Sequence, residues 1–222
     1  MRLSKKILLA CSAASVLLLS GCVPILFGGT AATSAAVITD RRTTGNIVSD
    51  EVIEKRVSYD ISQAIGSEGM HITVTSYDGK VLLTGEVATQ EAKDKAQSIA
   101  QQSLDVKSVV NELSVEPVTS VSQRLSDSML ATKVRSQIIG TSKISLNQMK
   151  VTVDRGIVYL MGIVTQQEAE TTKQVASGVS GVKRVVAVFS VESEEMVRQR
   201  MHDIENAQST QNKDGEPSEI TE

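Results

Sequence analysis

The chain has 222 residues and a formal net charge of −3 at pH 7. It lacks tryptophan and has only 2% aromatic residues, so its core must be built from aliphatic side chains. Its only cysteines are Cys11 and Cys22, and Cys11 lies in a segment that we expect to be removed. The single remaining thiol excludes an intramolecular disulfide and a cysteine metal cage.

Residues 1–21 have the pattern of a bacterial secretory signal. A basic start precedes an apolar run from Ile7 to Leu19, which is shorter than the roughly 20 residues that span a bilayer as a helix. The run ends in Leu19-Ser20-Gly21-Cys22, which resembles the lipobox of bacterial lipoproteins. We expect acylation of Cys22, with an ordinary signal peptide and a chance cysteine as the alternative. Val23 follows, and by analogy the absence of an aspartate there indicates sorting to the outer membrane, facing the periplasm.

Residues 22–46 are rich in Ala, Thr and Gly and carry no charge before Asp40, which predicts a lipidated flexible linker. Beyond this linker, residues 47–116 and 124–194 are two copies of one unit, separated by a short polar linker at 117–123. The copies align at an offset of 77, which falls to 76 towards their ends, and we place the lost residue within the second helix of the unit. The aligned pairs include Ile53 with Leu130, Val57 with Val134, Ile61 with Ile138, Gly79 with Gly156, Leu83 with Leu160 and Val115 with Val191.

Each copy predicts the order helix, strand, strand, helix, strand. Apolar residues at i, i+4 and i+8 form one face of the first helix, and Asp50 and Asp127 are its predicted N-caps. A hairpin turn follows at Asp78-Gly79, and Asp154-Arg155-Gly156 stands in the same place in the second copy. The second helix of the second copy begins with a capping box, Thr165 to Glu168. The last strands are predicted at 106–115 and 182–191.

This order predicts an α+β fold in which two helices cover a three-stranded mixed sheet in each copy. A unit of about 70 residues is near the lower limit for an independent core, so we expect the copies to pack on each other or to be individually modest in stability. Residues 195–222 predict a C-terminal helix, with Val197, Met201 and Ile204 on one side, followed by a disordered tail.

The pattern of a hydrophobic helix, then "VTSYDGKVLLTGEV" or "VTVDRGIVYLMGIV", an Ala-rich helix and "GVKRVV" resembles the BON domain. Two such domains behind a lipobox are similar to lipid-anchored dual-BON proteins of the outer membrane, and "ATKVRSQII" favours these over soluble dual-BON proteins. In those members the first helix of the second domain binds phospholipid and has Trp where this chain has Met129. The resemblance implies the same role here for Met129, Leu130, Lys133, Arg135, Ser136 and Ile139.

Charge supports this choice of helix. Residues 47–116 contain 6 Lys or Arg and 12 Asp or Glu, whereas residues 124–194 contain 9 and 6, so only the second copy is basic. Cations beside an exposed Met129 would suit an interfacial helix on anionic lipid such as phosphatidylglycerol or cardiolipin. The alternative is that Met129 and Ile139 pack against the first copy or the C-terminal helix. An exported, acidic chain excludes nucleic acid as a partner.

No catalytic motif is present. His71 and His202 share no metal-binding spacing, and no phosphate-binding glycine loop or nucleophile elbow occurs. The sequence therefore predicts a non-enzymatic protein without cofactor or metal. The resemblance implies roles in envelope integrity and at the division site, and contact with the outer-membrane protein assembly machinery. The alternative is a periplasmic protein-interaction scaffold.

Overall fold

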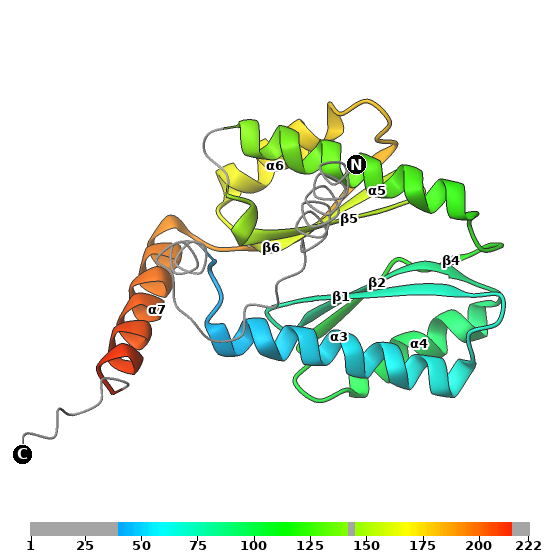
Figure 1. The fold of residues 1–222 in the computed structure, drawn as a ribbon, viewed down its shortest axis with the longest axis horizontal. Helices are drawn as coiled ribbons and strands as arrows, with labels where there is room; N and C mark the ends of the chain where they lie inside the picture. The colour runs from blue at the N-terminus through cyan, green and yellow to red at the C-terminus, as the bar shows by residue number, and fades with distance from the viewer. Residues whose placement is uncertain (1–39, 142–144, 215–222) are drawn as a thin grey trace, which may run out of the picture. The chain divides into compact units, whose positions relative to one another are not determined.

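The computed structural model describes residues 40–141 and 145–214, which belong to a unit that spans Ala35–Glu222. Figure 1 shows their helices and strands. The predicted signal peptide, Cys22 and most of the predicted linker lie outside the described residues. Among the residues described, no helix is both long enough and apolar enough to cross a membrane.

The first copy has the predicted order of elements. Helix α3 spans Thr44–Ile65, and strands β1 and β2 span His71–Tyr77 and Lys80–Val87. Helix α4 spans Gln90–Gln102, and the short strands β3 and β4 span Ser108–Asn111 and Ser114–Val115. Strand β2 pairs antiparallel with β1 and parallel with β3 and β4, which gives the mixed sheet that the sequence predicts.

The second copy repeats this order. Helix α5 spans Val121–Gly140, the 3₁₀ turn η2 spans Leu146–Gln148, and strands β5 and β6 span Met149–Asp154 and Ile157–Val164. Helix α6 spans Gln166–Ser177 and strand β7 spans Arg184–Val191. Strand β6 pairs antiparallel with β5 and parallel with β7.

Both hairpins turn through two residues with positive φ, Asp78 and Gly79 in the first copy and Arg155 and Gly156 in the second. Two positive φ angles in a two-residue loop define a type I′ turn, which matches the twist of the flanking strands. The hairpin prediction is confirmed in both copies. The predicted capping box is confirmed as well: the Thr165 side chain accepts from the Glu168 N–H, and the Glu168 side chain accepts from the Thr165 N–H.

Three details of the prediction are wrong. The lost residue is not within the second helix: Ala88 separates β2 from the N-cap Thr89, whereas the N-cap Thr165 follows β6 directly. The last strand of the first copy is interrupted at Glu112 and Leu113, although β3 and β4 pair with β2 in the same register. The helices also begin earlier than predicted, with the N-caps at Thr43 and Ser120 rather than at Asp50 and Asp127.

Asp50 and Asp127 instead lie buried inside their helices and bind the hairpin turns. The Asp50 carboxylate accepts the N–H groups of Asp78 and Gly79, and the Asp127 carboxylate accepts those of Arg155 and Gly156. A backbone N–H at the tip of a tight turn has no partner in the strand ladder. Each aspartate, about 28 residues earlier in the chain, provides the acceptor for these N–H groups. The two carboxylates therefore fix each hairpin to the first helix of its copy.

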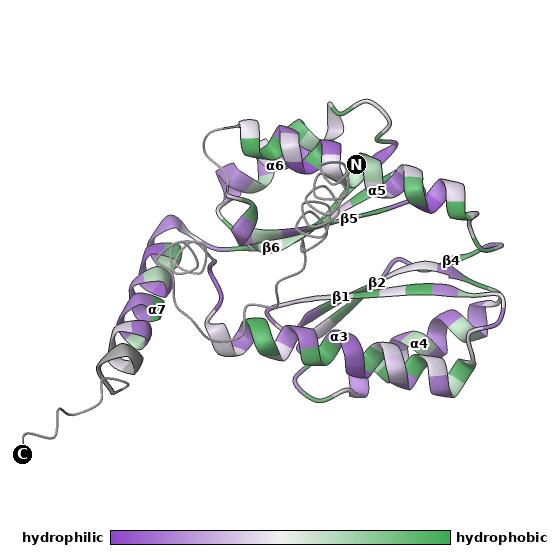
Figure 2. Ribbon diagram, in the orientation of Figure 1, coloured by the Kyte–Doolittle hydropathy of each residue, from purple (hydrophilic) through white to green (hydrophobic). Residues whose placement is uncertain are grey.

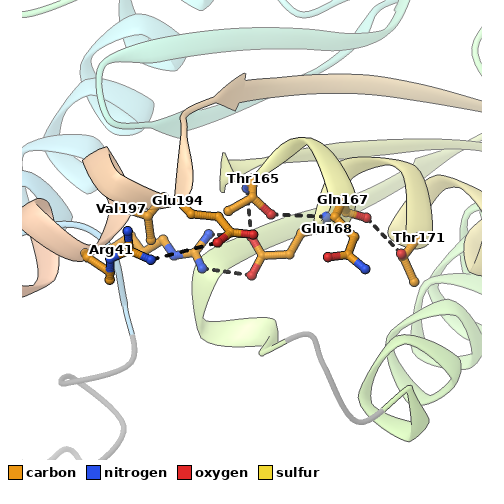
Figure 3. Close-up of a pocket in the computed structure, with 8 residues that line it drawn as sticks. Arg41, Thr165, Gln167, Glu168, Thr171, Glu194 and Val197 are labelled. Carbon is orange, nitrogen blue, oxygen red and sulfur yellow. Dashed lines mark hydrogen bonds and ion pairs between the residues drawn. The ribbon is translucent and has the colours of Figure 1, made fainter.

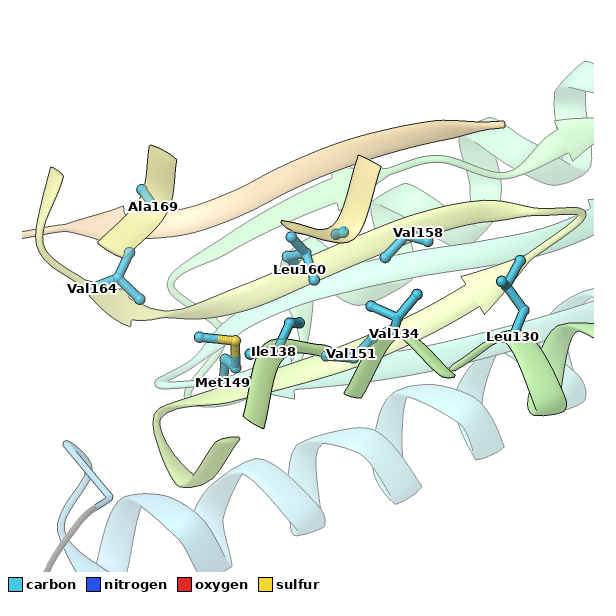
Figure 4. Packing of buried hydrophobic residues seen from close by; sticks show 10 residues of the cluster. Leu130, Val134, Ile138, Met149, Val151, Val158, Leu160, Val164 and Ala169 are labelled. Atoms are coloured by element: carbon cyan, nitrogen blue, oxygen red, sulfur yellow. The ribbon is translucent and has the colours of Figure 1, made fainter. Parts of the chain in front are cut away.

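Each copy has its own aliphatic core between sheet and helices. In the second copy, Leu130, Val134 and Ile138 of α5 pack on strand residues such as Val151 and Leu160 (Figure 4). The first copy packs Ile53, Val57 and Ile61 of α3 in the same way.

A third cluster joins the two sheets. It contains Tyr77 and Leu82 from the first copy and Tyr159, Met161 and Ile163 from the second. In β2 and β6, one set of alternating residues faces the helices of its own copy, and the other set faces the sheet of the other copy. Both central strands are therefore buried along nearly their whole length. The copies pack on each other, which is the first of the two outcomes that their size predicts.

The C-terminal helix α7 spans Glu194–Asp214 and is mostly hydrophilic (Figure 2). Its predicted inner residues Val197 and Ile204 are buried. At the other end of the described chain, the predicted flexible linker extends too far: residues 40–42 are buried, and α3 begins at Thr44. The reason is a set of contacts made by Arg41 and Arg42, described below.

Candidate functional site

The outer face of α5 carries exposed apolar side chains. Met129 is 58% exposed and Ile139 is 60% exposed, and Val121 and Leu125 are exposed as well. Val121, Leu125 and Met129 follow one another at intervals of four, which places them on one side of the helix. The core residues Leu130, Val134 and Ile138 occupy the opposite side. A contiguous apolar patch on the solvent side of a helix is typical of an interaction surface.

The structure separates the six residues predicted to bind lipid into two groups. Met129, Lys133, Arg135, Ser136 and Ile139 are exposed on α5. Leu130 is only 8% exposed and belongs to the core of the second copy, so it cannot reach a membrane that α5 lies on. Leu130 anchors the helix instead.

Lys133 and Arg135 differ in their freedom. The Arg135 guanidinium donates a hydrogen bond to the Val151 carbonyl of β5, which holds it at the edge of the sheet. Lys133 has no hydrogen bond or ion pair with any residue that the structure describes. It lines, with Ser136, a cleft of about 650 Å³ between α5 and the C-terminal end of α6. Lys133 is therefore the more available cation for an anionic ligand.

The exposure of Met129 and Ile139 also decides between the two expectations for them. Neither side chain packs against the first copy or α7, because either contact would cover most of its surface. The expectation that they are buried within the chain is wrong for the part of it that the structure describes.

The corresponding helix of the first copy, α3, has a similar stripe in a different charge environment. Val48, Val52 and Tyr59 are exposed and stand 77 residues before Leu125, Met129 and Ser136. Along its length α3 has four acidic and two basic residues, whereas α5 has one acidic and three basic residues. The two helices share an apolar surface, but only α5 surrounds it with excess positive charge.

Sequence reasoning missed Val121 and Leu125. The predicted N-cap at Asp127 places both residues before the helix, whereas the helix begins at Val121. The start signal was Ser120, whose hydroxyl accepts a hydrogen bond from the Gln123 N–H.

The two histidines do not come together. His71 lies in β1 with Nδ1 3.9 Å from the Glu86 carboxylate, and His202 is exposed on α7. Within residues 40–141 and 145–214, no group of three or more His, Cys, Asp or Glu side chains is placed to hold a metal ion.

Comparison with known proteins gives the family. The BON domain matches residues 49–117 and again residues 126–193, which are the two copies described above. The chain therefore belongs to the BON domain family, with two BON domains in tandem.

Individual relatives narrow the class. The chain is 38% identical to the outer membrane lipoprotein DolP of Haemophilus influenzae over 79% of this chain and 91% of that protein. It is 34% identical to the 21 kDa hemolysin of Actinobacillus pleuropneumoniae over 68% of this chain and 78% of that protein. Identity to the osmotically-inducible protein Y of Escherichia coli is 25%, over 64% of this chain and 72% of that protein. The chain is thus a DolP-like outer-membrane lipoprotein with two BON domains.

Proposed function

We propose that this protein binds anionic phospholipid through the outer face of α5 and performs no catalysis. The observation that carries the proposal is the exposed stripe of Val121, Leu125, Met129 and Ile139 beside Lys133 and Arg135. Apolar side chains would enter the acyl boundary while the cations remain near the phosphates, the arrangement of an interfacial helix. The expected lipids are phosphatidylglycerol and cardiolipin.

The two parts of this surface contribute in different ways. Each Lys or Arg near an anionic surface contributes about 1 kcal/mol, and salt screens this contribution. Burying the apolar stripe adds roughly 25 cal/mol per Å², which salt does not weaken. An acyl group on Cys22 would keep the protein at the membrane, so α5 needs only modest affinity to lie on it. In the cell we propose that this contact supports envelope integrity, including at the division site.

Vesicle sedimentation tests the proposal. The purified protein with Cys22→Ser, which cannot be acylated, would be mixed with vesicles of phosphatidylcholine alone or with phosphatidylglycerol or cardiolipin. We expect binding to the anionic vesicles only, weaker at higher salt, and lost on replacing Leu125, Met129 and Ile139 together with serine. Serine at Val48, Val52 and Tyr59 of α3 is the matched control and should bind normally. Equal binding by both triple variants would refute the assignment to α5.

A second candidate is a protein-interaction scaffold that serves the outer-membrane assembly machinery. The exposed stripe of α3 favours it, because this apolar surface lies on the acidic copy, where anionic lipid is repelled. A photo-crosslinker at Val52 in growing cells would join to one protein in stoichiometric yield if this candidate holds, and a crosslinker at Met129 would not.

A further inference from the structure

Three charged residues that directly precede α3 are buried. Asp40, Arg41 and Arg42 are each 6 to 7% exposed, although charged side chains are almost never fully buried unless they are paired. They stand at the end of the predicted linker, where sequence composition gives no reason for burial. Their partners lie in both BON domains.

Arg41 binds the second domain. Its two terminal nitrogens donate to the two carboxylate oxygens of Glu168, at 2.6 and 2.8 Å (Figure 3). One of these nitrogens also donates to the Ile163 carbonyl of β6 at 2.9 Å. Burial alone would raise the pKa of Glu168, but hydrogen bonds from Arg41 and Thr165 outweigh it and lower the pKa, so the pair is ionic at neutral pH. A bidentate fork of this kind fixes orientation as well as distance.

Arg42 binds the first domain. Its guanidinium donates to Asp50 of α3 at 2.9 Å and to Asp40 at 2.7 Å, and it stacks 3.9 Å from the centre of the Tyr77 ring. The Tyr77 hydroxyl in turn donates to the Gln148 carbonyl of the second domain at 2.9 Å. The adjacent residues Arg41 and Arg42 therefore bind different domains, at the interface between the two.

We propose that residues 40–42 are an interdomain clasp that locks the two BON domains into one fixed orientation. Arg41 reaches across to β6 and α6, and Arg42 holds α3 and the first hairpin. The charged bonds of the clasp are directional, as is the ion pair between Lys150 and Glu54 across the domains, whereas the apolar cluster between the sheets is not. The clasp therefore narrows the arrangements that the cluster alone would tolerate. The clasp does not depend on lipid binding by α5.

Distances between spin labels test the clasp. The labels would be placed at Gln101→Cys on α4 and Lys173→Cys on α6, which are both exposed, in the mature chain with Cys22→Ser. Pulsed electron resonance should give one narrow distance distribution for this parent protein. Arg41→Gln and Arg42→Gln should each broaden it, while circular dichroism shows that the domains remain folded.

Arg198→Gln is the control, because Arg198 pairs with Glu194 one turn earlier in α7, and this pair does not link the domains. It should leave the distribution narrow. Should an arginine variant fail to fold, Glu168→Gln decides. The amide keeps the size of the side chain but removes its charge and one of the two acceptors of Arg41, so it too should broaden the distribution. Narrow distributions in folded Arg41→Gln and Arg42→Gln, or in Glu168→Gln where those do not fold, would overturn the proposal.

Discussion

The Asp50 carboxylate of α3 accepts a hydrogen bond from the N–H of Gly79, 29 residues away at the tip of the first hairpin, at 2.9 Å. Asp127 and Gly156 repeat this bond in the second domain at the same length. Because the same contact occurs in both domains, it is a feature of the repeated unit and not of one copy. The bond joins the first helix to the hairpin, and both of these elements precede the last strand of the domain in the chain.

This contact predicts a large loss of stability on Asp127→Ala. The change leaves the N–H groups of Arg155 and Gly156 without their acceptor, and a hydrogen bond to a charged group contributes about 1.5 to 3 kcal/mol. We expect a loss of about 3 kcal/mol in the free energy of unfolding, measured by urea denaturation. Ser128→Ala, one residue along and exposed, should change it by less than about 0.5 kcal/mol. Similar stabilities for the two variants would show that the turn does not need the carboxylate.

Two glycines predict a second effect on folding. A Cβ at Gly85 would lie 1.9 Å from the His71 carbonyl oxygen, where φ is also +113°, and a Cβ at Gly162 would lie 2.4 Å from the Gln148 carbonyl oxygen. Both neighbours are backbone atoms and cannot turn away. Gly85→Ala and Gly162→Ala should each cost more than about 3 kcal/mol, in the range of the most damaging substitutions.

Gly140 provides the comparison, because a Cβ there would meet nothing within 4 Å. Gly140→Ala at the end of α5 should leave the melting temperature unchanged or slightly higher, since alanine favours helix. A normal melting temperature for Gly85→Ala would mean that β1 and β2 can separate at that point without cost.

Much of this fold follows from local sequence. The hairpin at Asp78-Gly79 and the apolar face of α5 each depend on residues within a few positions of one another, so the sequence predicts both. The roles of Asp50 and Arg41 are not, because their partners lie 29 and 127 residues away, and only the packed fold brings them together. The same limit applies to the site. The family resemblance and the charge of the second copy predict Met129 and Lys133, but the hydrogen bond from Arg135 to the Val151 carbonyl of β5 depends on the folded sheet.

Asp154 predicts how stability changes with pH. Burial raises its pKa, and the negative charges of Glu86 and Asp127 raise it further, so the ionised carboxylate is less favourable in the folded protein than in the unfolded chain. A carboxyl group with a raised folded pKa lowers stability above that pKa and has no effect below its unfolded value of about 3.9. Asp154→Asn should therefore be more stable than the parent at pH 7.

The advantage of Asp154→Asn should shrink as the pH falls towards 4, when the parent's own carboxyl becomes neutral. Thermal melts of both proteins between pH 4 and pH 8 measure it. A difference in melting temperature that stays constant over this range would mean that the asparagine acts through packing or hydrogen bonding rather than by removing charge.

Met129→Trp gives the sharpest test of the membrane surface. Tryptophan favours the membrane interface, and it presents about 50 Å² more apolar area than methionine, worth about 1 kcal/mol or about fivefold in affinity. We expect that gain for phosphatidylglycerol vesicles in sedimentation. Val52→Trp is the matched change on α3, 77 residues earlier and also exposed, but among acidic residues. If the lipid surface is α5, only the change at Met129 strengthens binding; equal gains at both positions would mean that any exposed tryptophan binds these vesicles and that the positive charge of the second domain selects nothing.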